Sequence, residues 1–198
     1  MAASELPAYL ASLPRLVTDT LVIYVSGELN VELNINGFYG SGSIKIISSS
    51  SNFKVNQPVY ISYCTVPVML ENVQIALQSG VSAYTGACSI NRCKYVRLDN
   101  CVLTGKKEKD IPGITIAEGG SLVCEGTSVS SFNTAINVQR SSVCSVYGTS
   151  EHFSDNTYGA YVWHGGIIML GGTVPDALGG STNLKQGGLI VKSDSTLL

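Results

Sequence analysis

The fold is decided by three consecutive segments, ITIAEGGSLVCEGTSVSSFNTA (114–135), INVQRSSVCSVYGTSEHFSDNT (136–157) and AYVWHGGIIMLGGT (160–173). Each opens on a short apolar strand, crosses a polar turn and continues into a second apolar strand. Repetition at this spacing is typical of proteins built from stacked units, since a unit of two or three short strands cannot bury its own apolar face. The pattern therefore predicts a parallel β-solenoid, in which each coil packs on the next.

A fixed register extends the repeat over five windows of sequence, which recur every 22–28 residues. The first and third positions of each window are apolar, and period-two alternation directs them to a core. The fifth position holds only Asn or Gly, which tolerate the left-handed backbone of a sharp bend. The windows are VMLENV (68–73), VRLDNC (96–101), LVCEGT (122–127), CSVYGT (144–149) and IMLGGT (168–173). The bend residues are Asn72, Asn100, Gly126, Gly148 and Gly172, and Ile90, Ile116, Val138 and Val162 mark a second strand upstream.

Composition agrees with an all-β chain that has many tight turns, because Gly is 21 of 198 residues, apolar residues are 44% and charged residues 13%. A disordered chain would combine low hydrophobicity with high net charge, and is excluded. With 12 Lys and Arg against 14 Asp and Glu, so is a strongly basic nucleic-acid binder. No apolar run nears the roughly 18 residues of a membrane span, and the start lacks the features of a signal peptide. We therefore expect neither a nucleic-acid partner nor membrane insertion.

The first residues differ from the rest and predict a short capping helix. Ser4 is its expected N-cap and Pro14 its expected stop, with an apolar face between them. We expect an N-terminal helical cap over residues 1–17 and a parallel β-helix over residues 18–198, together forming one domain.

The repeat resembles the right-handed parallel β-helix of the pectate-lyase-like proteins, whose asparagine ladder the repeated bend matches. The opening LPAYLASLPRLVTDTLVIYVSGELNVELNINGFYGSGSIKII (6–47) is similar to that of β-helical modules in tail proteins of bacteriophages and prophages of Gram-positive hosts. There a short helix caps the solenoid, and a GFYGSGSI-type turn and strand follow. The motif resemblance covers about residues 1–50, and beyond it the repeat pattern alone carries the comparison.

The resemblance implies a tail spike or tail appendage that contacts a polysaccharide on the host surface. Such a protein is made in the bacterial cytoplasm and acts outside it, in the virion tail. Tail spikes are commonly homotrimers, so we expect a homotrimer for the full-length protein. The abrupt start before the capping helix suggests that the chain is a piece of a longer tail protein.

Aromatic residues near the C-terminus are the strongest candidates for sugar binding. If Val162 points inward, Tyr161 and Trp163 point outward, next to Asn137 and Gln139 one coil earlier. Aromatic rings can stack on the apolar faces of sugars while amides bond their hydroxyl groups. The alternative is that Trp163 packs under a loop or in a subunit contact, where aromatic residues are also enriched. The candidate carbohydrate-binding residues are Trp163, Tyr161, Tyr147, Asn137, Gln139, Arg140 and His164.

Carboxylates occupy the fourth position of three windows, as Glu71, Asp99 and Glu125. Stacked coils lie about 4.8 Å apart, so these side chains would form a column. A polysaccharide lyase or hydrolase could use them with Arg97 or Arg140 as a cationic partner, because glycosidases need paired carboxylates. The alternative is a solvated face in which Arg97 and Lys94 relieve the negative charge.

Charges of alternating sign stand four residues before the later anchors of the repeat, as Arg92, Glu118 and Arg140, followed by His164. This second column predicts ion pairs between neighbouring coils, worth roughly 0–1 kcal/mol each at a surface.

The cysteines indicate no metal centre, since no CxxC pair is present among the six and the chain has only two His. Three disulfides are possible, but Cys124 and Cys144 fall on apolar core positions, which favours mostly free thiols. We expect no cofactor.

The sequence is compatible with three functions. The favoured one is a non-catalytic tail appendage module that recognises a host surface glycan. The second is a depolymerase, a lyase or hydrolase that uses the carboxylate column. The third is a structural spacer without any ligand.

Overall fold

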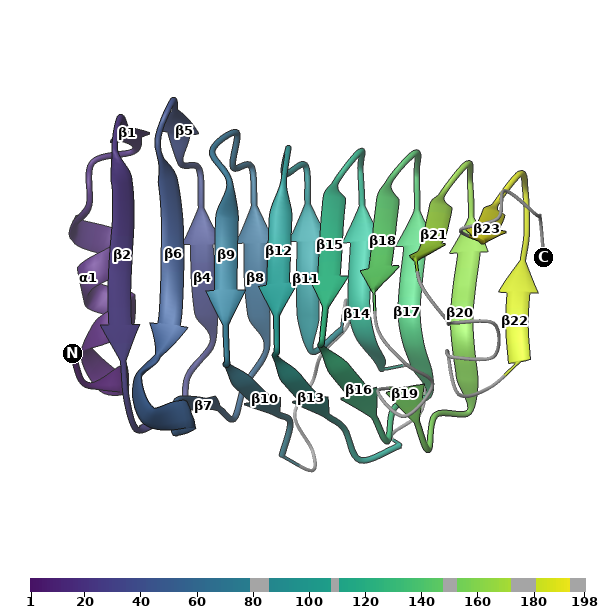
Figure 1. The fold of residues 1–198 in the computed structure, drawn as a ribbon, viewed down its shortest axis with the longest axis horizontal. Coiled ribbons are helices and arrows are strands. Elements are labelled where there is room, and N and C mark those ends of the chain that lie inside the picture. The colour runs from purple at the N-terminus through teal and green to yellow at the C-terminus, as the bar shows by residue number, and fades with distance from the viewer. Residues whose placement is uncertain (79–85, 108–110, 148–152, 172–180, 193–198) are drawn as a thin grey trace.

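The protein is a right-handed parallel β-solenoid in a computed structural model that describes residues 1–78, 86–107, 111–147, 153–171 and 181–192. The chain winds through six complete coils, and each coil visits three parallel sheets in the same order (Figure 1). The N-terminus and the last described residues (189–192) lie at opposite ends of the stack. The predicted fold class, an all-β solenoid with one short N-terminal helix, is confirmed.

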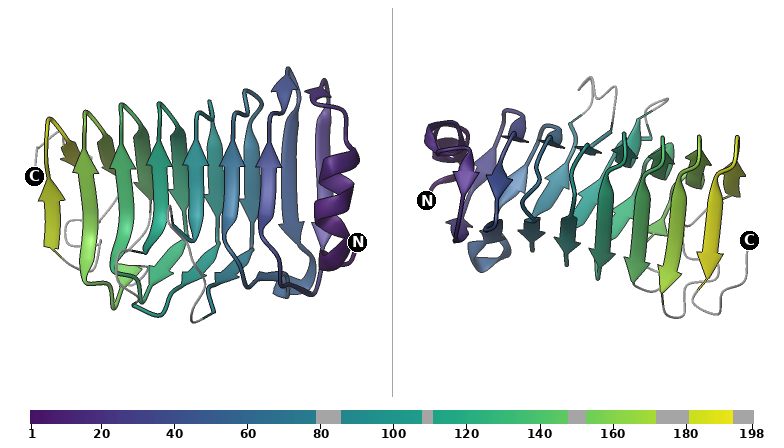
Figure 2. Two further views of the ribbon diagram at one scale, coloured as in Figure 1. Left: turned by 180° about the vertical axis from the view of Figure 1, so that it is seen from behind. Right: turned by 90° about the horizontal axis from the view of Figure 1, so that it is seen from above.

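Each coil begins in an eight-stranded sheet, passes through a six-stranded sheet and ends in a seven-stranded sheet, which faces the viewer in the left panel of Figure 2. The eight-stranded sheet consists of β2 (Thr20–Val25), β6 (Ser43–Ser48), β9 (Val68–Glu71), β12 (Val96–Asp99), β15 (Ser121–Glu125), β18 (Val143–Tyr147), β21 (Ile167–Gly171) and β23 (Leu189–Lys192). The six-stranded sheet consists of β3 (Glu28–Leu29), β7 (Lys54–Val55), β10 (Gln74–Ala76), β13 (Val102–Thr104), β16 (Ser128–Ser130) and β19 (Phe153–Ser154). The seven-stranded sheet consists of β4 (Leu33–Asn36), β8 (Val59–Ser62), β11 (Cys88–Asn91), β14 (Pro112–Ala117), β17 (Thr134–Gln139), β20 (Tyr158–Trp163) and β22 (Ser181–Leu184).

A short helix lies across the N-terminal end of the solenoid (Figure 2). The 3-10 turn η1 (Ala3–Glu5) leads into α1 (Leu6–Ser12), whose buried face packs Leu6 and Leu10 on the first coil. The N-cap is Glu5 and not Ser4 as predicted, because Ser4 lies inside the preceding 3-10 turn. Three further short elements lie near the N-terminal end of the solenoid. Strand β1 (Leu16–Val17) pairs with β5 (Tyr39–Gly40), and the 3-10 turn η2 (Ser49–Ser51) follows β6.

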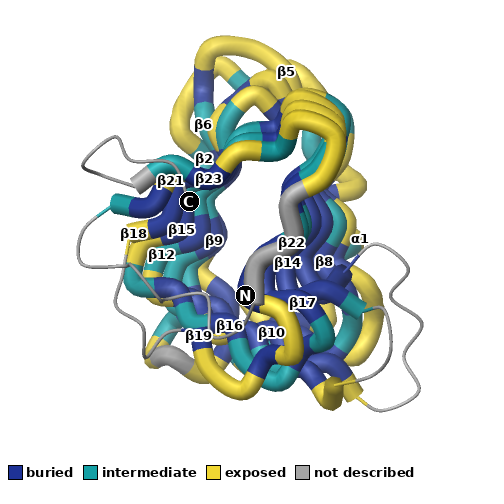
Figure 3. Tube along the Cα trace, turned by 90° about the vertical axis from the view of Figure 1, so that its right-hand side faces the viewer, coloured by how far each residue is buried: buried dark blue, intermediate teal, exposed yellow. Residues whose placement is uncertain are grey.

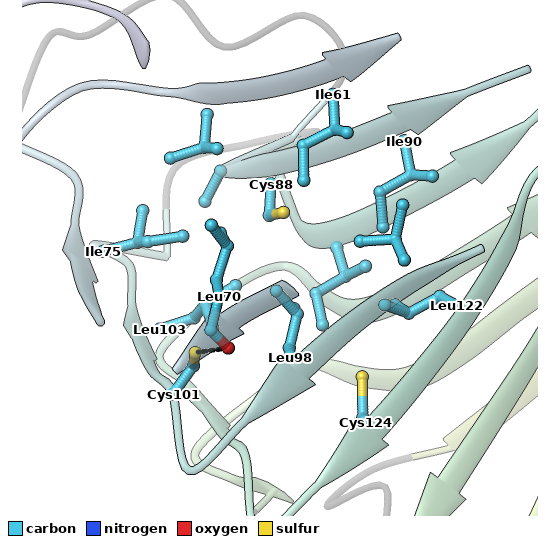
Figure 4. Close-up of a cluster of buried hydrophobic side chains, with 14 of the residues drawn as sticks. Ile61, Leu70, Ile75, Cys88, Ile90, Leu98, Cys101, Leu103, Leu122 and Cys124 are labelled. Atoms are coloured by element: carbon cyan, nitrogen blue, oxygen red, sulfur yellow. Dashed lines mark hydrogen bonds between the residues drawn. The ribbon is translucent and has the colours of Figure 1, made fainter. Parts of the chain in front are cut away.

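The core is a stack of apolar side chains from all three sheets, inside the ring of strands seen end-on in Figure 3. The predicted register is confirmed, since the first anchors of the five windows are direct partners on neighbouring strands. The upstream strand behaves in the same way from β11 to β20. Leu70, Leu98 and Leu122 face Ile61 and Ile90 across the interior (Figure 4). Each fully buried side chain of this size stabilises the fold by roughly 1.5–3 kcal/mol.

The predicted bend lies between the eight-stranded and six-stranded sheets. Asn72, Asn100 and Gly126 have φ values of 57°, 50° and 57°, so each adopts the left-handed conformation. Gly126 leaves room there for the side-chain oxygen of Asn100, which a β carbon would meet. Gly148 and Gly172, the other two members of this set, lie outside the described residues.

A second left-handed bend joins the seven-stranded sheet to the next coil. Glu118 and Gly119 both have positive φ, and the Gly120 N–H donates to the Ala117 carbonyl at 3.1 Å, as in a type I′ turn. The same turn recurs at residues 163–166 and 185–188, again with Gly at its third position. In the coil that ends with β17, Ser141 takes the place of that Gly, with φ 59°.

Replacing Ser141 with Gly should raise the free energy of unfolding by about 0.5–1 kcal/mol, since the left-handed conformation costs a residue with a β carbon about 1–2 kcal/mol and extra unfolded-state entropy offsets part of the gain. Urea unfolding would measure the change. The control is Ser128→Gly in strand β16, which we expect to lower stability because Gly loses more backbone entropy on folding than any other residue. An unchanged midpoint for Ser141→Gly would contradict the prediction.

Candidate functional site

The outer face of the seven-stranded sheet carries the predicted aromatic residues. Val162 is buried in the core, so Tyr161 and Trp163 on either side of it point outward. On the neighbouring strand β17 their partners are Asn137 and Gln139, as the repeat predicts. These residues therefore form one continuous surface across two coils.

The aromatic cluster is held in place by its own contacts. The rings of Tyr161 and Trp163 meet edge to face with their centroids 6.1 Å apart, and the His164 ring lies 4.0 Å from Trp163. The Trp163 indole N–H donates to the Asn137 side-chain oxygen at 3.3 Å. The Lys185 ammonium stands 5.5 Å from the Tyr161 ring centre. Both large rings are half-buried, so each presents part of its surface to solvent.

A groove of about 540 Å³ runs along the same sheet and reaches the strand next to the aromatic cluster. It crosses β4, β8, β11, β14 and β17, and Gln139 at its end pairs with Trp163 in the next coil. Its lining is amide, hydroxyl and apolar, with Arg140 the single charged residue among the described residues that form it. The lining residues are Asn34, Tyr60, Ile61, Ser62, Tyr63, Ser89, Ile90, Asn91, Thr115, Ala117, Gln139 and Arg140.

The sequence-based candidates Gln139 and Arg140 cover only the end of this groove. A signal for the rest was present, since the outward positions of the strands β4, β8 and β11 read Asn, Ser or Tyr where a solvated face would carry charges. Two polar atoms in the groove make no hydrogen bond to any described residue: the side-chain oxygen of Asn91 and the hydroxyl of Thr115.

The rim of the groove is the alternating charge column. Glu118 forms ion pairs with Arg140 and, at 3.7 Å, with Arg92, whose guanidinium lies 5.4 Å from the Tyr63 ring centre. Arg140, more than Arg92, holds the pKa of the Glu118 carboxyl below its usual value. The predicted inter-coil pairing is confirmed, and His164 at the end of the column contacts Trp163 instead of a charge.

The carboxylate column exists, but on the outer face of the eight-stranded sheet. Glu71, Asp99 and Glu125 are direct partners on β9, β12 and β15, as predicted. Arg97 contacts Asp99 at 3.3 Å and Glu125 at 2.5 Å, whereas Lys45 contacts Glu71 at 2.6 Å. Each carboxylate thus has a cation partner, and the arrangement is a ladder of salt bridges.

Two sequence-based expectations for this face are wrong. Lys94 forms no ion pair with the described residues, and its expected place is taken by Lys45, which precedes Glu71 by one coil. Tyr147 does not lie beside Trp163, because it belongs to β18, where it continues the carboxylate column next to Glu125. Trp163 belongs to β20 in the seven-stranded sheet, so the two residues lie on different faces of the solenoid.

All six cysteines are buried free thiols. Cys101 follows a left-handed residue, and its thiol donates to the Leu70 carbonyl of the previous coil at 3.3 Å (Figure 4). Thr127 donates to the Leu98 carbonyl from the equivalent position one coil later, so these side chains hold strand ends together. Burial raises the pKa of the Cys101 thiol to about 12. Among the described residues, no group of three or more His, Cys, Asp or Glu side chains is placed to hold a metal ion.

Comparison of the chain with protein-family models, with curated proteins and with solved structures finds no match. None of the described helices has the length and apolar character that crossing a membrane would require.

Proposed function

We propose that this protein is a non-catalytic carbohydrate-binding β-helix that contacts its ligand through the outer face of the seven-stranded sheet. The observation that carries the proposal is the half-buried pair Tyr161 and Trp163, set beside amide side chains at the end of a polar groove. A sugar ring has apolar C–H faces and hydroxyl edges. Aromatic rings with adjacent hydrogen-bonding groups match both parts at once.

The biological setting that we propose is a tail appendage of a bacteriophage or prophage of a Gram-positive host. The ligand would then be a host surface polysaccharide, the location the virion tail, and the assembly of the full-length protein a homotrimer. Support for this setting comes from the resemblance of about residues 1–50 to β-helical tail modules.

Binding without cleavage is favoured because the candidate acids are engaged elsewhere. A hydrolase needs one carboxyl group to donate a proton and a second to act as base or nucleophile, both beside the sugar. The described residues that line the groove include no carboxylate, and Glu118 at its rim is paired with Arg140 and Arg92. Glu71, Asp99 and Glu125 are salt-bridged on another sheet.

Replacing Trp163 with Ala should weaken retention of the protein on the glycan by about tenfold or more, because truncating a central aromatic contact commonly costs at least 1.4–2 kcal/mol. Tyr161→Ala should act in the same direction. The assay is retention on fixed cells and on extracted surface polysaccharides from a panel of Gram-positive bacteria, with released sugar measured in parallel. Thermal unfolding of each variant shows whether the fold is intact.

Tyr24→Ala is the matched control, since Tyr24 is an exposed aromatic residue of β2 on the eight-stranded sheet. It should leave retention unchanged. Release of oligosaccharides, lost in Asp99→Asn, would establish the depolymerase instead. Absence of both retention and release across the panel would leave the structural spacer as the best account.

A further inference from the structure

We infer that the groove binds an uncharged, hydroxyl-rich stretch of glycan that lies parallel to the solenoid axis, with the hydroxyl of Thr115 and the side-chain oxygen of Asn91 as its buried contacts. The inference rests on the proposed function and adds the class of the ligand and the direction of its chain. It extends the binding surface from the aromatic cluster back through five coils of the seven-stranded sheet.

The first support is the pair of unpartnered polar atoms in the groove. Thr115 is only 4% exposed and its hydroxyl bonds to no described residue; the oxygen of Asn91, on the neighbouring strand β11, is buried and equally unpartnered. A buried polar atom without a partner costs about 1–3 kcal/mol, so such atoms call for an explanation. Both residues line the groove, so a ligand bound there would lie against them.

The chemistry of these atoms selects the ligand class. The amide oxygen of Asn91 can only accept a hydrogen bond, so the ligand must bring a donor to it. A sugar hydroxyl can donate to Asn91 and can also accept from the Thr115 hydroxyl. A carboxylate or phosphate can only accept, and would place its charge against the lone pairs of Asn91.

The charge of the groove also favours an uncharged ligand. Arg140 is the one ionised residue among the described lining residues, and its guanidinium is already paired with Glu118. A site built for an anionic polymer would present unpaired cations along its length. The groove offers instead amides and hydroxyls at successive strands.

The direction of the ligand follows from the stacking of coils. Equivalent residues of neighbouring strands recur about every 4.8 Å along the axis. This spacing is close to the length of one sugar unit in an extended chain, so successive sugars would meet successive strands from β4 to β17. The next strand places Trp163 beside Gln139, where the end of the chain would stack on the aromatic cluster.

Thr115→Val is the decisive variant, because it keeps the shape of the side chain and removes only the hydroxyl. We expect it to melt at the same or a higher temperature than the parent, since no internal bond is lost. We also expect glycan affinity to fall about three- to tenfold, the loss of one neutral hydrogen bond. A residue with a purely structural role would not give equal or higher stability together with weaker binding.

Ser142→Ala is the matched control. The Ser142 hydroxyl is likewise buried and unpartnered, but it does not line the groove. Its removal should leave the melting temperature equal or higher and binding unchanged. If Thr115→Val binds like the parent while Trp163→Ala does not, the groove is rejected as a site and glycan binding by the aromatic cluster stands.

The ligand class is tested with polysaccharide extracts of the bacterial panel, separated by anion exchange into uncharged and anionic fractions. We expect the protein to bind the uncharged fraction, with affinity that rises from its disaccharide to its pentasaccharide fragments and then levels off. Binding confined to the anionic fraction would overturn the inference while leaving glycan recognition intact. Binding to neither fraction would reject both proposals.

Discussion

Replacing Asn156 with Ala is expected to lower the free energy of unfolding by about 2–4 kcal/mol, because two buried backbone groups lose their partners. The side-chain oxygen of Asn156 accepts from the Phe132 N–H at 3.0 Å, and its amide nitrogen donates to the Val129 carbonyl at 2.9 Å. Asn156 is 8% exposed, so water cannot readily replace either bond. One side chain thus joins the segment after β19 to strand β16 and to the segment that follows β16, one coil earlier.

Urea unfolding followed by circular dichroism measures the loss. Asn36→Ala is the control, since Asn36 is exposed on β4 and accepts a hydrogen bond only from the Ser62 hydroxyl among the described residues. A change within about 0.5 kcal/mol is expected there, as for most surface substitutions. Equal urea midpoints for the two variants would contradict the prediction that the two hydrogen bonds of Asn156 make a large contribution to stability.

The inter-coil register was predictable because it depends on local chemistry. Alternation of apolar residues fixes which side chains enter the core, and a slip of one residue would turn every one of them outward. Asn72, Asn100 and Gly126 mark the bend because few residues other than Asn and Gly adopt the left-handed conformation without cost. Together they align the strands of the eight-stranded sheet across five coils, which the structure confirms from β9 to β21.

The second bend escapes prediction from the sequence for a physical reason. The sequence predicts Glu118, Arg140 and His164 only as members of a charge column, whereas all three adopt positive φ. The usual sign of such a turn is the Gly that follows, and the coil with Ser141 interrupts that sign. The charge pairing and the turn are both real, but the turn decides where the charges lie, at the rim of the groove.

The sequence predicts which residues are equivalent on neighbouring coils better than it predicts which residues share one face of the solenoid. Tyr147 and Trp163 are close in sequence, but the bends between strands place them on different sheets. Lys45 lies before the first of the five repeat windows, which starts at residue 68, so the repeat does not predict it as the partner of Glu71. The groove is formed by outward-facing side chains of five coils together. Its shape therefore cannot be predicted from any single segment of the sequence.

Replacing Gly166 with Ala is expected to lower the free energy of unfolding by about 3 kcal/mol, at the upper end of the usual cost of overpacking. A β carbon at Gly166 would stand 2.5 Å from the Val138 carbonyl oxygen and 2.9 Å from the Val138 carbonyl carbon. These are backbone atoms of the previous coil, paired in register with β20, so they cannot move without opening the stack. The damage would fall directly beside Trp163, whose carbonyl accepts the Gly166 N–H at 3.0 Å.

Gly165→Ala is the matched control from the adjacent position. Gly165 has φ 72°, and a β carbon there would meet nothing closer than the Ser141 hydroxyl at 3.8 Å. Its cost is therefore the left-handed backbone alone, about 1–2 kcal/mol. Urea unfolding of both variants separates the two effects, and the expected order is a larger loss for Gly166→Ala. A larger loss at Gly165 would mean that backbone conformation, and not inter-coil spacing, governs stability at this turn.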